Sequence, residues 1–153
     1  MPIALADLLD ERRINLDMAA RDHTGAVREL VDLLAQSREI KQAAEFSDLV
    51  RRRELASTTL AENGVAFPHA RTDLIKQIVL AAGRSEHGIA WPDQNGRAHL
   101  IFLIGVPQNL ISDYVVVIGT IARTTKDSAL RTLLLHAETK QEFIATMLGA
   151  NSI

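Results

Sequence analysis

Apolar positions repeat with the period of an α-helix in the first third of the chain. The stretch after the turn at residues 22–25 predicts a helix with Thr24 as its N-cap and one buried stripe, formed by Val27, Leu30, Val31 and Leu34. A second helix is predicted over residues 46–54, with Ser47 or a nearby residue as its start signal and an inward side formed by Phe46, Leu49 and Val50. Its last residues are basic, which suits the negative end of a helix dipole.

The same period returns at both ends of the chain. A brief stripe is formed near the start by Leu5, Leu8 and Leu9, and two longer stripes lie within residues 129–134 and 143–148. Thr139, three residues before Glu142, is typical of a capping box at the head of the last helix. Residues 114–124 fit a strand by their β-branched content or a helix by their length, and we favour the helix.

Short apolar runs predict the strands. Residues 78–82 and 100–104 have strand length and read as core strands, and residues 14–16 predict a shorter one. Residues 88–91 predict a separate extended piece, and the Asn-Gly pair within residues 92–96 favours a tight reversal, which indicates a hairpin. Helices and strands interleave without a regular βαβ order, so we expect an α/β or α+β sandwich with a mixed β-sheet flanked by helices.

Composition narrows the class of protein. The 153 residues fit one domain, which we take as residues 1–153, and the net charge of −2 gives no reason to expect a nucleic-acid partner. There is no cysteine, so a thiolate nucleophile and cysteine-ligated metal sites are excluded. The first seven residues carry an acid where a signal peptide carries basic residues, and no apolar run has the length of a bilayer span. We therefore expect a cytoplasmic protein without stable membrane insertion.

One histidine stands out as a candidate for chemistry. His69 follows a proline in the stretch Phe67-Pro68-His69-Ala70, shortly after Gly64. Proline fixes its own φ and biases the residue before it toward extended geometry, so a short strand is expected here, with the imidazole held at one angle. A rigid imidazole suits a reacting group, and the alternative is an ordinary surface histidine in a loop.

Two motifs together resemble a known family. The stretch Arg-Glu-Leu-x-Ser-Thr at residues 53–58 and the stretch Gly-x-Ala-x-Pro-His at residues 64–69, with residues 88–91 and 98–104, resemble the fructose/mannitol type of IIA domain from the bacterial phosphoenolpyruvate-dependent phosphotransferase system. This type includes the nitrogen-regulatory IIA proteins. The resemblance covers nearly the whole chain and implies a mixed sheet flanked by helices.

The resemblance also implies roles for individual residues. It makes His69 the phosphoacceptor, phosphorylated by HPr or an HPr-like protein, and Arg53 the cation that stabilises the phosphate. The receiver is a IIB domain in the sugar-transporting members. Ser57 and Thr58 either bind phosphate or cap the loop, and Arg71 either reaches the phosphate or is an exposed charge. Arg53 has a simpler alternative too, as a solvated charge at a helix end.

The chain departs from the family pattern at one position. Sugar-transporting members carry a second histidine at the head of the helix after the strand at residues 100–106, and Tyr114 stands at the matching place here. A tyrosine hydroxyl donates one hydrogen bond but carries no positive charge near neutral pH. A register shifted by one residue would put Asp113 there, and its charge would repel a phosphate.

These observations leave two classes of function open. In the first, His69 is phosphorylated and passes the group on or holds it as a signal, and the missing second histidine slightly favours the nitrogen-regulatory type. In the second, the chain is a non-catalytic binding module that has lost phosphotransfer, so whether it is an enzyme stays open. No cofactor is expected. We expect His23 and His87 to lie in solvated turns, and none of the other histidines has the spacing of metal ligands.

Overall fold

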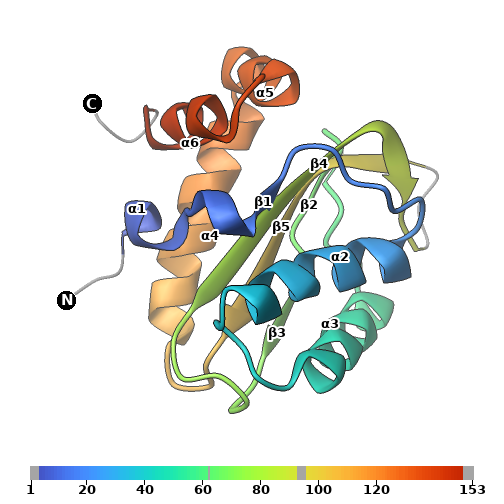
Figure 1. The fold of residues 1–153 in the computed structure, drawn as a ribbon, viewed down its shortest axis with the longest axis vertical. Coiled ribbons are helices and arrows are strands. Elements are labelled where there is room, and N and C mark those ends of the chain that lie inside the picture. Colours follow the sequence, from blue (N-terminus) through green and yellow to red (C-terminus); the bar gives the residue numbers. More distant parts are fainter. Residues whose placement is uncertain (1–3, 62, 93–95, 150–153) are drawn as a thin grey trace.

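The computed structural model of the chain describes residues 4–61, 63–92 and 96–149. Within these residues one mixed sheet lies between two layers of helices (Figure 1). Its strands are β1 (Ile14–Asn15), β2 (Val65–Ala66), β3 (His69–Arg71), β4 (Val79–Ala90) and β5 (Arg97–Val106). The helices are α1 (Leu5–Leu8), α2 (His23–Gln36), α3 (Ala43–Ala56), α4 (Ile111–Lys126), α5 (Ser128–His136) and α6 (Lys140–Gly149), with a 3₁₀ turn at Glu11–Arg13.

The sheet has the order β1-β4-β5-β2, and β3 pairs with β5 further along the same side. The central pair, β4 and β5, is antiparallel, whereas β1 runs parallel to β4 and both β2 and β3 run parallel to β5. The predicted mixed sheet and the predicted hairpin are therefore confirmed. The turn predicted within residues 92–96 has its central residues, 93–95, outside the described part of the chain.

The core has two halves because both faces of β5 are covered. Ile101 and Leu103 belong to the half that packs under α2 and α3. Leu100, Phe102 and Ile104 point to the opposite face, where they pack with residues of α1, α4, α5 and α6. Strand side chains alternate between faces, so a strand buried on both sides reads in the sequence as an unbroken apolar run. This is why residues 100–104 predicted a core strand correctly.

Two helix starts differ from the prediction. The side chain of Asp22, not that of Thr24, caps α2, because its carboxylate accepts a hydrogen bond from Gly25 N at 2.8 Å. The helix α3 begins at Ala43 without a side-chain cap, so Ser47 lies within it and is not a start signal. The side-chain cap of α2 thus lies two residues earlier than predicted, and α3 has none.

The predicted extended piece at residues 88–91 is wrong as a separate element, because it continues β4 up to Ala90. The pairing of β4 with β5 shifts register between Arg84 and Ile89, and Gly88 has a φ of 85° there. Glycine adopts this left-handed conformation without steric cost, so the strand bulges and then resumes. A bulge breaks the alternation of side chains, and the sequence pattern then suggests two elements instead of one.

The C-terminal helices follow the predicted stripes. The hydroxyl of Thr139 accepts a hydrogen bond from Glu142 N at 3.0 Å, as the capping box predicts. The second hydrogen bond of the capping box differs, because the carboxylate of Glu142 accepts from Glu138 N instead of Thr139 N. No helix in the described part of the chain combines the length and the apolar character that crossing a membrane requires.

Arg84 ties distant parts of the fold together. It lies in β4, is half-buried, and donates from Nε to the carbonyl of Leu16 at 3.1 Å. Its Nη1 donates to the carbonyls of Leu134 and Ala137, at 3.0 and 2.7 Å, at the end of α5. A guanidinium can serve several acceptors at once and suits the negative end of a helix. The residues before α2 and the corner between α5 and α6 are therefore attached to the same strand.

We expect Arg84→Met to lower the free energy of unfolding by about 2–3 kcal/mol, because hydrogen bonds to a charged donor are lost and half-buried carbonyls are left unpaired. The matched control is Arg28→Met on the exposed side of α2, which should change it by no more than about 0.5 kcal/mol. Urea denaturation measures both. Equal losses in the two variants would contradict the role given to Arg84.

Candidate functional site

The backbone places His69 at the edge of the sheet. After β2 the residues Phe67 and Pro68 interrupt the pairing, and β3 begins at His69, opposite Ile104 of β5. The carbonyl of Pro68 accepts a hydrogen bond from Ile104 N at 3.0 Å, so the proline is held against β5 although it has no N–H to donate. The imidazole thus lies at the start of a short strand next to a proline, as the sequence predicts. The break in strand pairing at Phe67 and Pro68 comes just before it.

The hydrogen bond of the His69 ring defines its tautomer. Nδ1 lies 2.9 Å from the carbonyl oxygen of Phe67. A carbonyl oxygen only accepts, so Nδ1 carries the proton and the neutral ring keeps its lone pair on Nε2. Burial lowers the pKa of His69, the Phe67 hydrogen bond opposes this, and the charges of Arg53 and Glu54 act in opposite directions, lowering and raising it. A half-buried ring with its lone pair on Nε2 is a nucleophile near neutral pH.

The ring of Tyr114 faces His69. It belongs to the first turns of α4, and the two ring centroids are 5.4 Å apart with a tilt of 34°. Burial raises the pKa of Tyr114, so its hydroxyl stays protonated at neutral pH and can donate a hydrogen bond. The ring contact therefore agrees with the predicted register, which placed Tyr114 and not Asp113 beside the histidine. The group that faces His69 is therefore neutral at neutral pH.

Arg53 lies in the last turn of α3, and its side chain is held by a backbone carbonyl just past the helix. Its Nη1 donates to the carbonyl oxygen of Ser57 at 2.8 Å, just past the end of the helix. The positive charge of Arg53 lowers the pKa of both His69 and Tyr114, which means that it acts on both rings. The charge of the predicted cation therefore acts on both of the predicted ring residues.

The three remaining predicted residues have different surroundings. Ser57 is exposed and contributes its carbonyl to Arg53. The hydroxyl of Thr58 accepts a hydrogen bond from Leu60 N at 3.1 Å, so it stabilises the loop. Arg71 is exposed in β3, on the face of the strand that also carries His69, because side chains two positions apart share a face.

Glu54 connects the site to the core, and it is not among the residues predicted for the site. It is 2% exposed, and its carboxylate accepts hydrogen bonds from Thr59 N, from Thr59 Oγ1 at 2.6 Å and from Trp91 Nε1 at 2.9 Å. The carbonyl of Thr59 in turn accepts from Phe67 N at 3.2 Å. A signal was present, because Glu54 continues the i, i+4 stripe of Phe46 and Val50 and must therefore face the core.

His23 differs from the expectation of a solvated turn residue. It is 6% exposed, and its ring meets Trp91 edge-on at a centroid distance of 4.7 Å. The prediction was wrong because α2 begins at His23, so its side chain is already in the helix and turned toward the end of β4. His87 is exposed, as expected. Among the described residues no group of three or more histidine, aspartate or glutamate side chains is arranged to hold a metal ion.

Comparison with known proteins gives the family. The family described as "Phosphoenolpyruvate-dependent sugar phosphotransferase system, EIIA 2" matches residues 7–149. A fructose-specific EIIA component from Haloferax volcanii is 30% identical over 129 residues, which are 84% of this chain and 84% of that protein. The fructose-specific EIIABC component of Bacillus subtilis is 24% identical over 92% of this chain, which spans only 22% of that longer protein.

Solved structures share the fold. The nitrogen regulatory protein IIA-Ntr of Neisseria meningitidis superposes with a TM-score of 0.85 at 25% identity, over 94% of this chain and 98% of that one. A complex of enzyme IIAMtl and phosphorylated enzyme IIBMtl from Escherichia coli matches with a TM-score of 0.80 at 18% identity, over 92% of this chain and 97% of that one. The second likeness is one of fold alone.

We expect the pKa of His69 in the folded protein to lie below its ordinary value of 6.5, and Arg53→Gln to raise it, because the substitution removes a nearby positive charge. Arg28→Gln, which removes an exposed charge from α2, is the control and should leave it unchanged. NMR titration of the imidazole resonances measures the pKa and reports the tautomer at the same time. A ring with its proton on Nε2, or a pKa above 6.5, would contradict the geometry described for His69.

Proposed function

Because the chain belongs to the EIIA 2 family of the phosphoenolpyruvate-dependent sugar phosphotransferase system, we propose that it is a phosphocarrier that accepts a phosphoryl group on Nε2 of His69. The observation that carries the proposal is the hydrogen bond from Nδ1 to the carbonyl of Phe67, which leaves the lone pair of the ring on Nε2. The proposed donor is an HPr-like protein that carries the group on a histidine of its own. A cytoplasmic location is part of the proposal.

The transfer balances without any further reactant. The lone pair of Nε2 forms a bond to phosphorus while the bond from phosphorus to the donor's ring nitrogen breaks, and that nitrogen keeps the electron pair. His69 then carries a phosphoryl group on Nε2 and a proton on Nδ1, so its ring is positively charged. The carbonyl of Phe67 accepts from this ring and stabilises the charge, as hydrogen bonds to charged donors do. The reverse steps release the group to a receiver.

The neighbours of His69 supply the donors that such a transfer needs. The transition state spreads negative charge over the equatorial oxygens, and catalysis depends mainly on alignment and on hydrogen-bond donors. In the proposal Arg53 binds these oxygens with a guanidinium oriented by Ser57, and the hydroxyl of Tyr114 donates one hydrogen bond. Arg71 and the hydroxyls of Ser57 and Thr58 are proposed as secondary phosphate contacts.

Exposed apolar residues next to the site suit a protein partner. Ile111, Val115 and Val116 lie in α4 around Tyr114 and are 43%, 59% and 54% exposed. Contiguous exposed apolar side chains mark interaction surfaces, so we propose that donor and receiver dock on this side of α4. The receiver is either a IIB domain, as in the E. coli complex of IIAMtl and phosphorylated IIBMtl, or a regulatory target protein. We favour the regulatory type slightly, because Tyr114 replaces the second histidine.

The same replacement favours one alternative function. An imidazole beside the phosphate can carry positive charge, whereas the hydroxyl of Tyr114 is neutral. If Arg53 alone is insufficient, phosphotransfer is lost and the surface around α4 serves only as a protein-binding module. The two functions predict opposite results in a labelling experiment.

We expect incubation with phosphoenolpyruvate, enzyme I and an HPr-like carrier to add one acid-labile phosphoryl group, because Nε2 of His69 is a neutral nucleophile. Intact-mass spectrometry measures the gain, which should vanish in His69→Ala and persist in His87→Ala, the control at an exposed histidine. Absence of labelling by a donor shown to be active on another IIA protein would leave the binding module.

We expect Tyr114→Phe to slow labelling roughly tenfold, because it removes one hydrogen bond to the transferred group, worth on the order of 1 kcal/mol. Tyr114→His should label at least as fast as the natural chain, since it supplies an imidazole at the same place. Rapid-quench labelling at fixed donor concentration measures both rates. A Tyr114→Phe rate equal to that of the natural chain would remove the hydroxyl from the transfer step.

A further inference from the structure

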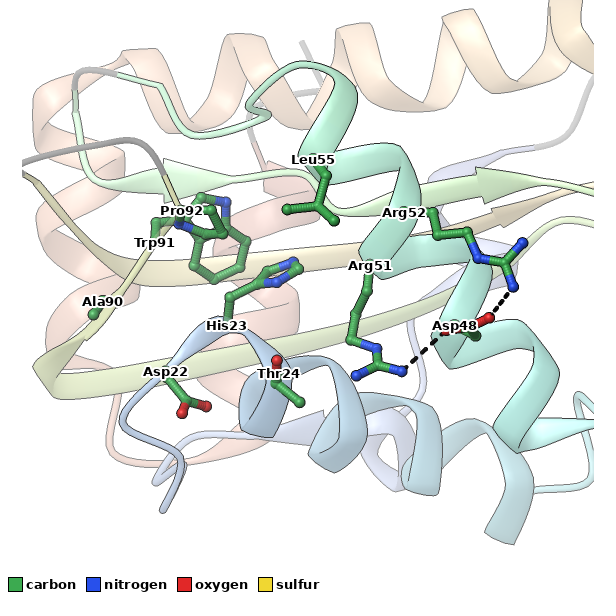
Figure 2. A pocket seen from close by; sticks show the side chains of 10 residues that line it. All are labelled: Asp22, His23, Thr24, Asp48, Arg51, Arg52, Leu55, Ala90, Trp91 and Pro92. Atoms are coloured by element: carbon green, nitrogen blue, oxygen red, sulfur yellow. Dashed lines mark hydrogen bonds and ion pairs between the residues drawn. The ribbon is translucent and has the colours of Figure 1, made fainter.

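A cleft of about 530 Å³ lies away from His69, on another side of α3. It is bounded by the start of α2, by α3 and by the residues that follow β4 (Figure 2). The α3 residues that line it, among them Arg51, Arg52 and Leu55, recur at helical spacing on one face. Arg53 lies nearly opposite that face, because each residue advances an α-helix by a little more than a quarter of a turn. The cleft and the His69 site are therefore separate surfaces.

The cleft has an apolar wall. Trp91 and Pro92 form one side, with the ring of His23 packed edge-on against Trp91. Leu55 forms the other side and is 68% exposed, which leaves a large apolar side chain uncovered at the rim. The volume falls in the usual range for small-molecule sites, and such sites combine an apolar lining with a few polar groups.

A buried polar nitrogen in this wall has no partner. His23 is 6% exposed, and its Nε2 is buried without a hydrogen bond among the described residues. Its ring reaches from the start of α2 toward Leu55 and Arg51 (Figure 2), and Nε of Arg51 is likewise buried and unpartnered. Burial lowers the pKa of His23, so the ring is neutral near pH 7. Buried polar groups in proteins are almost always paired, so two unpaired nitrogens in the lining of one cleft are an exception that requires an explanation.

The charged groups at the rim balance each other. Arg51 and Arg52 both pair with Asp48, Arg51 at 3.1 Å, and Asp22 lies at the start of α2. The Asp48 and Arg51 side chains are about 40% exposed, and exposed ion pairs of this kind contribute little to stability. Either residue can therefore give up this ion pair and bind a ligand charge at small cost. A ligand that carries only negative charge would be repelled by the two aspartates, and a cation by the two arginines. A ligand of both signs meets a partner for each.

We propose that this cleft binds a free amino acid with an apolar side chain. The carboxylate pairs with the guanidinium of Arg51 or Arg52, and the ammonium group pairs with Asp48 or Asp22. The apolar side chain lies against Leu55 and Trp91. The proposal does not rest on phosphoryl transfer at His69, because its test measures binding alone.

L-leucine is the probe, and the only tryptophan of the chain, Trp91, is the reporter. We expect a saturable change in tryptophan fluorescence, confirmed by calorimetry, with a Kd of about 0.01–1 mM, as suits a ligand of this size. Valine, isoleucine, methionine and phenylalanine complete the panel. Absence of binding by all five amino acids at concentrations up to about 10 mM would overturn the proposal.

Analogues and variants test the assigned contacts. 4-Methylpentanoate lacks the ammonium group and isoamylamine lacks the carboxylate, and each should bind at least tenfold more weakly than leucine. Leu55→Ser and Arg51→Gln should weaken leucine binding at least tenfold. Leu133→Ser in α5 and Arg28→Gln in α2 are the controls, because both residues are exposed and neither lines the cleft.

Each result decides the proposal. Leucine binding that is lost in the two cleft variants and kept in the two controls supports it. Equal binding of leucine and 4-methylpentanoate would overturn the zwitterion in favour of a simple anion site. Leucine binding unchanged by both Leu55→Ser and Arg51→Gln would place any ligand elsewhere and overturn the proposal. Neither cleft variant is expected to unfold the chain, since Leu55 is 68% exposed and the side chain of Arg51 is 39% exposed.

Discussion

The buried carboxylate of Glu54 is the constraint on which the arrangement around His69 depends. A charge removed from water is costly unless it is fully hydrogen-bonded, and Glu54 meets this condition with two donors from Thr59 and one from Trp91. These bonds fix the loop after α3 against the helix and against the end of β4. Since Thr59 also accepts from Phe67, whose carbonyl accepts from His69, the position of the ring is linked to Glu54 through a continuous series of hydrogen bonds.

This link explains why Arg53 and Glu54 are neighbours in the sequence but act in different directions. The side chain of Glu54 turns inward with the buried stripe of α3, whereas that of Arg53 is held at the surface by the carbonyl of Ser57. Consecutive helix positions lie about 100° apart, so one helix end supplies a cation to the surface and an anchor to the core. The short loop that follows can then bring the His69 strand close to both.

Much of the fold could be predicted, and the failures have local causes. The apolar stripe of α2 and the unbroken run in β5 survive in the structure because burial dominates there. The start of α3 could not be predicted, because it has no side-chain cap. The bulge at Gly88 breaks the alternation of side chains, so β4 was predicted as two elements. The burial of His23 depends on a contact with Trp91, which is far away in sequence, and periodicity carries no such information.

The residues of the candidate site could be proposed from the sequence, but its electrostatics could not. The residues that match the family motif include His69 and Arg53, and the departure at Tyr114 was visible in the sequence alone. The protonation states follow from the structure, because burial favours the neutral form of both His69 and Tyr114. Of the charged groups that act on the imidazole, the carboxylate of Glu54 is already hydrogen-bonded to donors from Thr59 and Trp91, whereas the guanidinium of Arg53 keeps donors for another acceptor. The site at rest therefore holds positive charge at its surface beside an uncharged nucleophile, which suits the arrival of an anionic group. A second imidazole would add to that charge at low pH, whereas Tyr114 keeps it independent of pH across the neutral range.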